Sequence, residues 1–110
     1  MEAKVFTSGN LGNDAKVINF ENGNAVISFS IATNSYYTNK DGEKIQNTTW
    51  HDCKKFVRNV NEKFIERLTK GATVTILGTL SYEEYDKEVT KTKSVKIRKA
   101  YIDVKAIEIL

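Results

Sequence analysis

The segment TTWHDCKKF, residues 48–56, brings together the side chains of this sequence that could do chemistry. It contains the only tryptophan, histidine and cysteine of the chain, Trp50, His51 and Cys53, with Asp52 between the last two. A histidine beside a cysteine can activate a thiol nucleophile, and a third group can orient that histidine. Histidine and cysteine are also common ligands of zinc. The spacing of these residues decides whether either chemistry is open to them.

The direction of each side chain argues against both. We interpret the segment as a β-strand, in which neighbouring side chains point to opposite faces, so Asp52 cannot orient His51. His51 and Cys53 share a face but lie roughly 7 Å apart along the strand, whereas a nucleophile and its base need about 3 Å. A zinc site needs about three or four ligands, whereas this chain offers a single histidine and a single cysteine. We therefore expect no enzyme, no cofactor and no metal site, with His51 and Cys53 packed inward or at a subunit contact.

The opposite face of the segment carries Trp50, Asp52, Lys54 and Phe56. A strand in a core seldom places an acid and a lysine between its large aromatics, but a strand in an exposed groove does. Aromatic rings stack on the bases of single-stranded nucleic acid, worth about 1–3 kcal/mol per base, and basic groups follow the backbone. A duplex hides its base faces, so this pattern favours single strands. RNA, an oligosaccharide or a protein partner could also occupy such a face.

Positive charge is concentrated near the C-terminal end. The chain has 17 Lys and Arg against 14 Asp and Glu, a net charge of +3. Between residues 87 and 99, six basic residues stand against Glu88 alone, a local sum of +5. Such a segment attracts polyanions, or it is a solubilising surface on an exposed strand pair.

Six short segments read as strands, separated by Gly- and Asn-containing turns. Residues 15–20 are either the continuation of the first strand or its partner. Four phenylalanines lie in apolar phases and are expected in the core. A change of phase in the last strand predicts a bulge near Arg98 and Lys99. The expected strands are 3–8, 15–20, 24–36, 48–56, 72–85 and 94–107, and the phenylalanines are Phe6, Phe20, Phe29 and Phe64.

A helix is predicted in NVNEKFIERLTKG, residues 59–71, where apolar side chains follow a helical stripe for about three turns. The order is then three strands, one helix and two strands in a single domain of 110 residues. This order favours an all-β fold with one helix, a five-stranded Greek-key barrel of OB type with the helix between strands three and four. The alternative is a small α+β domain with an open sheet.

Four stretches together resemble the bacterial single-stranded DNA-binding proteins, and the match is collinear over essentially the whole chain. The resemblance implies an OB fold over residues 1–110, a homotetramer or homodimer, and binding of single-stranded DNA without strong sequence preference in replication, recombination or repair. It also implies a cytoplasmic, nucleoid-associated protein. The stretches are GNLGND at 9–14, NGNAVISFSIATN at 22–34, TTWHDCKKF at 48–56 and RLTKGATVTILGTLSYEEY at 67–85.

The resemblance also implies site residues. Two of the four stacking positions, Trp50 and Phe56, are those that the alternation of side chains along the strand already places on the outward face. His51 stands near the subunit contacts of the family. Acidic residues at Asp52, Glu83 and Glu84 depart from the family pattern and are expected to repel phosphate, so that binding depends more on the basic segment. The stacking residues are Tyr37, Trp50, Phe56 and Tyr85, and the phosphate contacts are Lys4, Lys54, Lys70, Lys87, Lys91 and Lys93.

The ends of the chain and its composition give further expectations. The family normally continues into a flexible tail with an acidic tip that recruits replication and repair proteins, whereas this sequence stops at KAIEIL. The sequence is therefore either trimmed or a tailless variant, and recruitment by that route stays open. The start, MEAKVFTSGN, lacks the pattern of a secretory signal. A single cysteine fits a reducing, cytosolic setting, and the sequence holds no apolar run long enough to predict a membrane partner.

Overall fold

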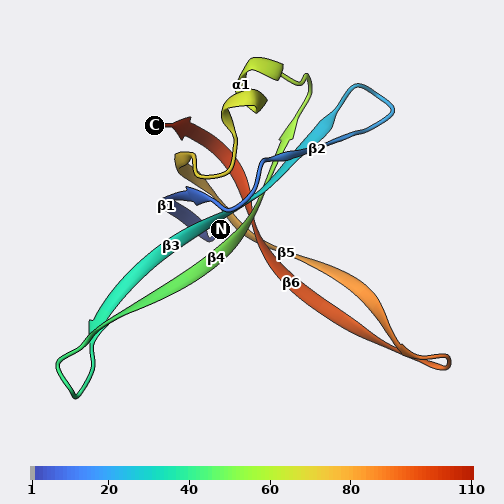
Figure 1. The fold of residues 1–110 in the computed structure, drawn as a ribbon. Coiled ribbons are helices and arrows are strands. Elements are labelled where there is room, and N and C mark those ends of the chain that lie inside the picture. The colour runs from blue at the N-terminus through green and yellow to red at the C-terminus, as the bar shows by residue number, and fades with distance from the viewer. Residues whose placement is uncertain (1) are drawn as a thin grey trace.

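The computed structural model describes residues 2–110, which form six β-strands and one short helix (Figure 1). The strands alternate buried and exposed side chains and are joined by polar turns, as period-two patterning requires. The elements are β1 Lys4–Leu11, β2 Lys16–Asn19, β3 Ala25–Thr38, β4 Lys44–Val57, α1 Glu62–Arg67, β5 Thr73–Thr90 and β6 Lys93–Ile109.

The strands form one sheet that closes on itself. Its order is β1-β5-β6-β4-β3-β2, and a further antiparallel pairing of β1 with β3, including Leu11 opposite Ile31, closes the sheet into a barrel. Strands β4 and β6 run parallel, with Cys53 opposite Ile102. This closed arrangement, with α1 between β4 and β5, confirms the predicted OB-type barrel and excludes the open sheet.

Strand β2 is short and continues the first strand. It pairs with β3 from Lys16 opposite Ser28 to Asn19 opposite Ala25, while β1 meets β3 further along at Leu11 opposite Ile31. Both strands therefore use the edge of β3 that does not pair with β4. Of the two interpretations of residues 15–20, continuation of the first strand is confirmed.

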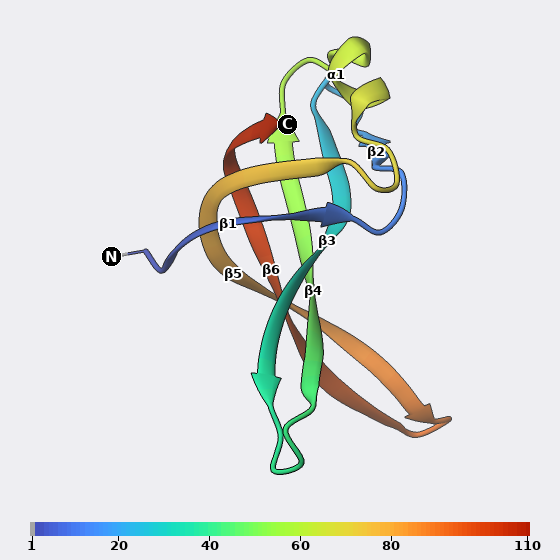
Figure 2. The ribbon, with the colours of Figure 1, turned by 60° about the vertical axis from the view of Figure 1, so that its left-hand side comes forward.

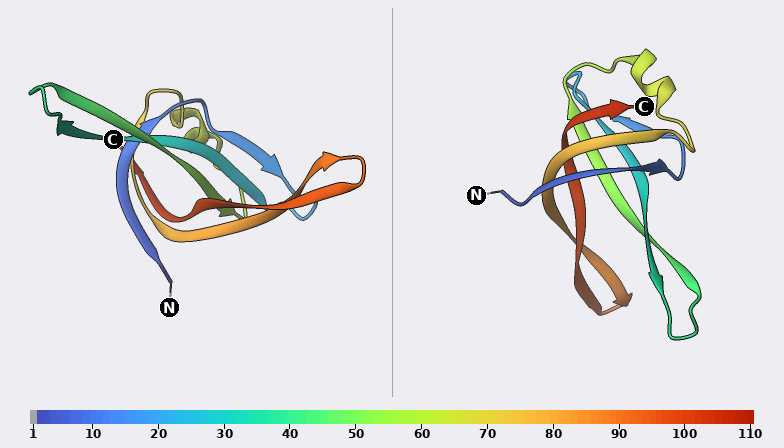
Figure 3. Two further views of the ribbon diagram at one scale, coloured as in Figure 1. Left: turned by 90° about the horizontal axis from the view of Figure 1, so that it is seen from below. Right: turned by 90° about the vertical axis from the view of Figure 1, so that its left-hand side faces the viewer.

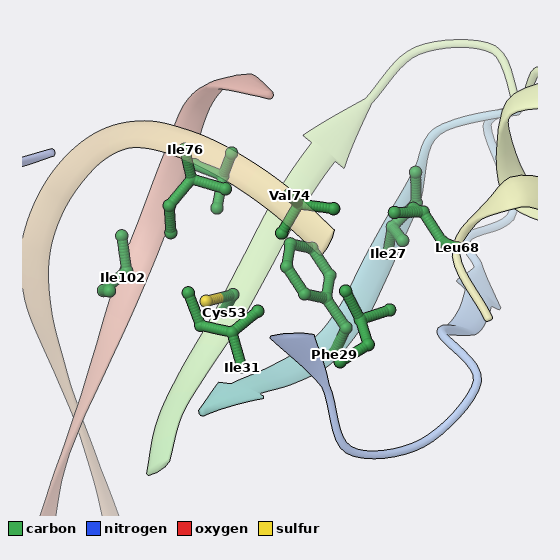
Figure 4. Close-up of a cluster of buried hydrophobic side chains, with 10 residues drawn as sticks. Ile27, Phe29, Ile31, Cys53, Leu68, Val74, Ile76 and Ile102 are labelled. Atoms are coloured by element: carbon green, nitrogen blue, oxygen red, sulfur yellow. The ribbon is translucent and has the colours of Figure 1, made fainter. Parts of the chain in front are cut away.

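The interior of the barrel is filled by apolar side chains from every long strand (Figure 4). On β3, Ile27, Phe29 and Ile31 are at most 5% exposed and point to one side. Cys53 of β4 and Ile102 of β6 meet them from the parallel pair. Burying each such side chain stabilises the fold by about 1.5–3 kcal/mol. This free energy strongly determines which side chains of each strand face the interior.

Helix α1 is six residues long, shorter than the predicted three turns. It begins after Asn61, whose side chain accepts a hydrogen bond from the backbone N–H of Phe64. It ends at Leu68, whose backbone leaves the helical conformation and whose side chain is only 1% exposed. Leu68 belongs to the buried cluster (Figure 4), and its burial therefore stops the helix before its apolar stripe is used up.

Two of the four phenylalanines expected in the core lie outside it. Phe29 is buried and Phe64 packs against the core, but Phe6 is 74% exposed and Phe20 is 45% exposed. On β1 the inward positions are Gly9 and Leu11, so Phe6 points outward. Phe20 follows the end of β2 in an exposed turn. The apolar character of a side chain alone does not show which face of a half-buried strand it occupies.

The prediction of a bulge near Arg98 and Lys99 is also wrong. These residues pair in unbroken register with Glu84 and Glu83. Register shifts fall instead between Leu77 and Gly78, where Lys105 is the extra residue on β6, and between Glu88 and Thr90 near the tip of the arm. The apolar residues before position 100 lie in an arm exposed to solvent, so their phase does not report the barrel interior.

Two long hairpins extend beyond the barrel, one formed by β3 and β4 and the other by β5 and β6 (Figures 1 and 3). They leave the end of the barrel opposite α1 and diverge (Figure 2). The radius of gyration is 17.0 Å, compared with about 13 Å for a compact domain of this length. The arms therefore enlarge the surface that the chain presents to a partner.

Candidate functional site

Strand β4 presents its even-numbered side chains outward. Trp50 is 59% exposed and Phe56 is 54% exposed, while Cys53 between them is fully buried. The alternation of a strand that lines a closed barrel produces this division. The predicted separation of the two faces, with Trp50 and Phe56 open to solvent, is confirmed.

Strands β6 and β5 extend this surface. Lys54 is opposite Asp103 on β6, which places the odd-numbered residue Tyr101 on the same side. Tyr101 and Lys99 are opposite Ser81 and Glu83 of β5. We call this surface the outer face. Its members are Trp50, Asp52, Lys54 and Phe56 on β4, Lys99 and Tyr101 on β6, and Glu83 and Tyr85 on β5.

The indole of Trp50 lies directly over Gly12, in the loop between β1 and β2. A Cβ atom added to Gly12 would lie 2.5 Å from one ring carbon of Trp50 and 2.8 Å from another. Such distances are too short for a side chain, so a glycine is required for the loop to approach the ring this closely. One side of the indole is thereby supported, while most of the ring remains exposed.

The acidic residues of the outer face are paired with lysines. Nζ of Lys54 lies 2.6 Å from Oε2 of Glu83 and 4.9 Å from the ring centre of Tyr101. Nζ of Lys99 lies 3.1 Å from Asp52, and this hydrogen bond raises the pKa of Lys99. All four side chains remain at least 28% exposed, so each pair contributes only about 0–1 kcal/mol. Lys54, a predicted phosphate contact, is therefore paired with Glu83 through a weak ion pair.

The four predicted stacking residues do not all share one surface. Tyr85 is 48% exposed and lies on the same side of β5 as Glu83, in line with the outer face. Tyr37 is 57% exposed, but it is opposite Ile45, in the phase of His51 rather than that of Trp50. The outer face thus brings together Trp50, Phe56 and Tyr85 and leaves Tyr37 on the other side of the β3–β4 arm.

The six predicted phosphate contacts are dispersed. Lys4 lies on β1 opposite Thr79 of β5, on the same side of the sheet as Lys54 but three strands away from it. Lys70 lies after α1, where its backbone N–H donates to Asp14 at 2.8 Å. Only Lys54 stands among the stacking residues. The remaining three, Lys87, Lys91 and Lys93, lie towards the tip of the β5–β6 arm.

Three tyrosines at the surface were not selected from the sequence. Tyr36 carries Lys44 over its ring at 4.6 Å, Tyr82 carries Arg98 at 4.1 Å, and Tyr101 carries Lys54. Tyr36 is opposite Gln46, in the phase of Trp50. The outward phase of Tyr101 could have been inferred, because its neighbour Ile102 has the apolar character of the barrel interior.

His51 and Cys53 are engaged in packing. Nε2 of His51 lies 2.9 Å from Oγ1 of Thr33, and the Cys53 thiol donates to the backbone carbonyl of His51 at 3.7 Å. Burial and, to a smaller extent, the negative charge of Asp52 together raise the pKa of Cys53 to about 12. The thiol is therefore protonated at neutral pH. Within residues 2–110 there is also no group of three His, Cys, Asp or Glu side chains placed to hold a metal ion.

A family model described as the single-strand binding protein family matches residues 2–110. The chain belongs to this family. Helices long and apolar enough to cross a membrane are absent from the part of the chain that the structure describes.

Relatives within the family come from distant organisms. The single-stranded DNA-binding protein of Aquifex aeolicus is 33% identical over 94 residues, covering 86% of this chain and 63% of that protein. The Neisseria meningitidis protein is 33% identical over 82 residues, covering 74% of this chain and 47% of its own. The chain therefore spans about half to two thirds of the length of these relatives.

Solved structures support the fold. The single-stranded DNA-binding protein of Thermus aquaticus matches with a TM-score of 0.75 at 22% identity, covering 97% of this chain and 49% of that chain. The Plasmodium falciparum protein, solved in complex with single-stranded DNA, matches with a TM-score of 0.73 at 22% identity, over 100% of this chain and 94% of its own. These likenesses show the same barrel.

The environment of Cys53 generates a prediction about thiol reactivity. Because the thiol is buried and its pKa is raised to about 12, it has almost no thiolate at pH 8. We expect Ellman's reagent to modify the folded protein at least tenfold more slowly than the urea-unfolded protein, in which the pKa returns to about 8.5. Equal rates in the two states would contradict the assignment of Cys53 to the interior.

Proposed function

We propose that this chain binds single-stranded DNA without strong sequence preference, by stacking bases on the outer face and neutralising phosphates with lysines. The observation that carries the proposal is the outer face of β4, where Trp50 and Phe56 are more than half exposed and Lys54 stands between them. Membership of the single-strand binding protein family supports the same partner.

The spacing of the two rings suits an extended strand. Six residues separate Trp50 from Phe56, about 20 Å along β4 at 3.3 Å per residue. Flat apolar rings at this separation can each accept a base that is unstacked from its neighbours, and any base offers a π-face. A duplex keeps its bases paired and stacked, so it reaches only the charged part of this surface.

A phosphate that contacts Lys54 or Lys99 has to replace the carboxylate that each lysine is paired with. Lys54 and Lys99 are held by Glu83 and Asp52, and an incoming phosphate competes with these carboxylates. The pairs are exposed and weak, so the exchange is favourable once a base has stacked nearby. Lys87, Lys91 and Lys93 on the β5–β6 arm extend the positive field over which the strand is captured.

Assembly and cellular role belong to the same proposal. A homotetramer or homodimer is supported by the exposed apolar side chains of adjacent strands, Phe6 on β1 at 74% and Leu77 on β5 at 40%. His51 is proposed near a subunit contact. We infer a non-catalytic role in replication, recombination or repair in the cytoplasm. The bacterial relatives are named single-stranded DNA-binding proteins, which supports the single-strand binding on which this role depends.

Truncation of either stacking ring tests the proposal. Trp50→Ala and Phe56→Ala should each weaken binding of a dT oligonucleotide by about 5- to 150-fold, because one stacked base contributes about 1–3 kcal/mol. Fluorescence anisotropy of a labelled oligonucleotide at fixed salt measures the effect. Trp50→Phe is the matched control, since it keeps a ring at the position and should retain most of the affinity. Native affinity in both alanine variants, with unchanged circular dichroism, would contradict stacking.

Removal of the carboxylate that holds Lys54 should strengthen binding. Glu83→Gln frees Lys54 for a phosphate, so we expect a several-fold higher affinity at low salt and a salt slope that steepens by up to about 0.7. Glu62→Gln makes the same charge change on α1, away from the outer face, and serves as the control. If both variants bind alike across a salt titration, the Lys54–Glu83 pair does not compete with the ligand.

A further inference from the structure

An apolar patch at the corner of the outer face joins Phe56 to two side chains that are not among the proposed stacking residues. Ile18 at the end of β2 is 55% exposed, and Phe20 in the following turn is 45% exposed. Three large apolar side chains, counting Phe56, therefore stand open to solvent at one end of the barrel. A contiguous exposed apolar patch is typical of an interaction site.

Strand register places these side chains on one surface. Ile18 is opposite Val26, and Val26 is opposite Phe56. Ile18, Val26 and Phe56 therefore form a row across β2, β3 and β4. Phe20 follows Ile18 by two residues and shares its phase. Phe20 and Phe56 line the same hollow, together with Asn24, Ala25, Val57 and Arg58.

The turn that carries Phe20 is held in place. The backbone N–H of Phe20 donates to the carbonyl of Asn24 at 2.8 Å, and the N–H of Gly23 donates back to the carbonyl of Phe20 at 3.3 Å. Gly23 has φ +84°, a conformation that glycine adopts without strain. The ring is therefore presented on a closed hairpin turn.

Basic side chains flank the patch. Arg58 lines the hollow and is exposed. Lys16 is opposite Ser28, which is opposite Lys54, so a row containing two lysines runs beside the apolar row. Glu21, also exposed, is the acid next to Phe20 in the sequence. Apolar rings bordered by cationic groups complement a single-stranded nucleic acid, whose bases are flat and whose backbone is anionic.

We propose that Phe20 forms a further base-stacking subsite for single-stranded DNA, which takes the nucleotide that follows the one on Phe56. Arg58 and Lys16 contact the adjoining phosphates, and Ile18 supports the stacked base. The inference rests on the proposed function and extends its path from β4 across the β2–β3 turn. Continuity with Phe56 and the positive border favour DNA over an apolar peptide as the occupant.

Substitutions at Phe20 test the subsite. A dT oligonucleotide of about 16 nucleotides, the upper end of the site size of one OB domain, is titrated by anisotropy. Phe20→Ala and Phe20→Leu should each weaken binding by about 5-fold or more, whereas Phe20→Tyr, which keeps the ring, should bind as the native chain does. The leucine variant separates stacking from apolar burial, and melting temperatures verify that each variant is folded.

The outcomes separate the subsite from the function on which it rests. Native affinity in Phe20→Ala and Phe20→Leu, alongside weakened binding in Phe56→Ala, overturns the subsite and leaves single-strand binding intact. Native affinity in Phe56→Ala and Trp50→Ala as well overturns both. As a second measurement, an oligonucleotide containing 5-iododeoxyuridine should crosslink under ultraviolet light to the peptide that contains Phe20. Crosslinks confined to the peptides of Trp50 and Phe56 would also overturn the subsite.

Discussion

Burial of Cys53, on the odd-numbered face of β4, in the closed barrel is the constraint on which the rest of the structure depends. Cys53 is fully buried against Ile31 and Ile102, so Trp50 and Phe56 have to point outward. A slip of one residue in the pairing of β4 with β3 would reverse every side chain and would bury the two rings. The packing of the core and the exposure of the site are thus two consequences of one register.

The electrostatics of the outer face follow from the same register. The parallel pairing of β4 with β6 and the antiparallel pairing of β6 with β5 bring Lys54 to Glu83 and Lys99 to Asp52. Exposed ion pairs contribute about 0–1 kcal/mol, less than the 1–3 kcal/mol of one stacked base. Under the proposed function, one stacked base therefore contributes more than is lost when a phosphate displaces the carboxylate from Lys54 or Lys99.

Strong alternation in β3 and the aromatic pair in β4 were sufficient to predict the barrel and the outward direction of Trp50 and Phe56. Tertiary pairing decided the rest. Phe6 and Phe20 share the apolar character of core residues, and only the closure of the sheet shows that they face solvent. Tyr37 is adjacent to Tyr36 in the sequence, so its face depended on the exact register of a long arm. The length of α1 was decided by burial of Leu68, which no helical pattern encodes.

Trp50 is the only tryptophan, so its fluorescence reports on the central claim without labels. Titration of the native chain with poly-deoxythymidine, excited at a wavelength that selects indole, measures whether a base stacks on this ring. The account predicts that the emission is quenched progressively to a plateau, and that added salt reverses the quenching as the phosphate contacts are lost. Unchanged emission at saturating ligand, with binding established by sedimentation, would show that DNA does not reach Trp50 and would contradict the account.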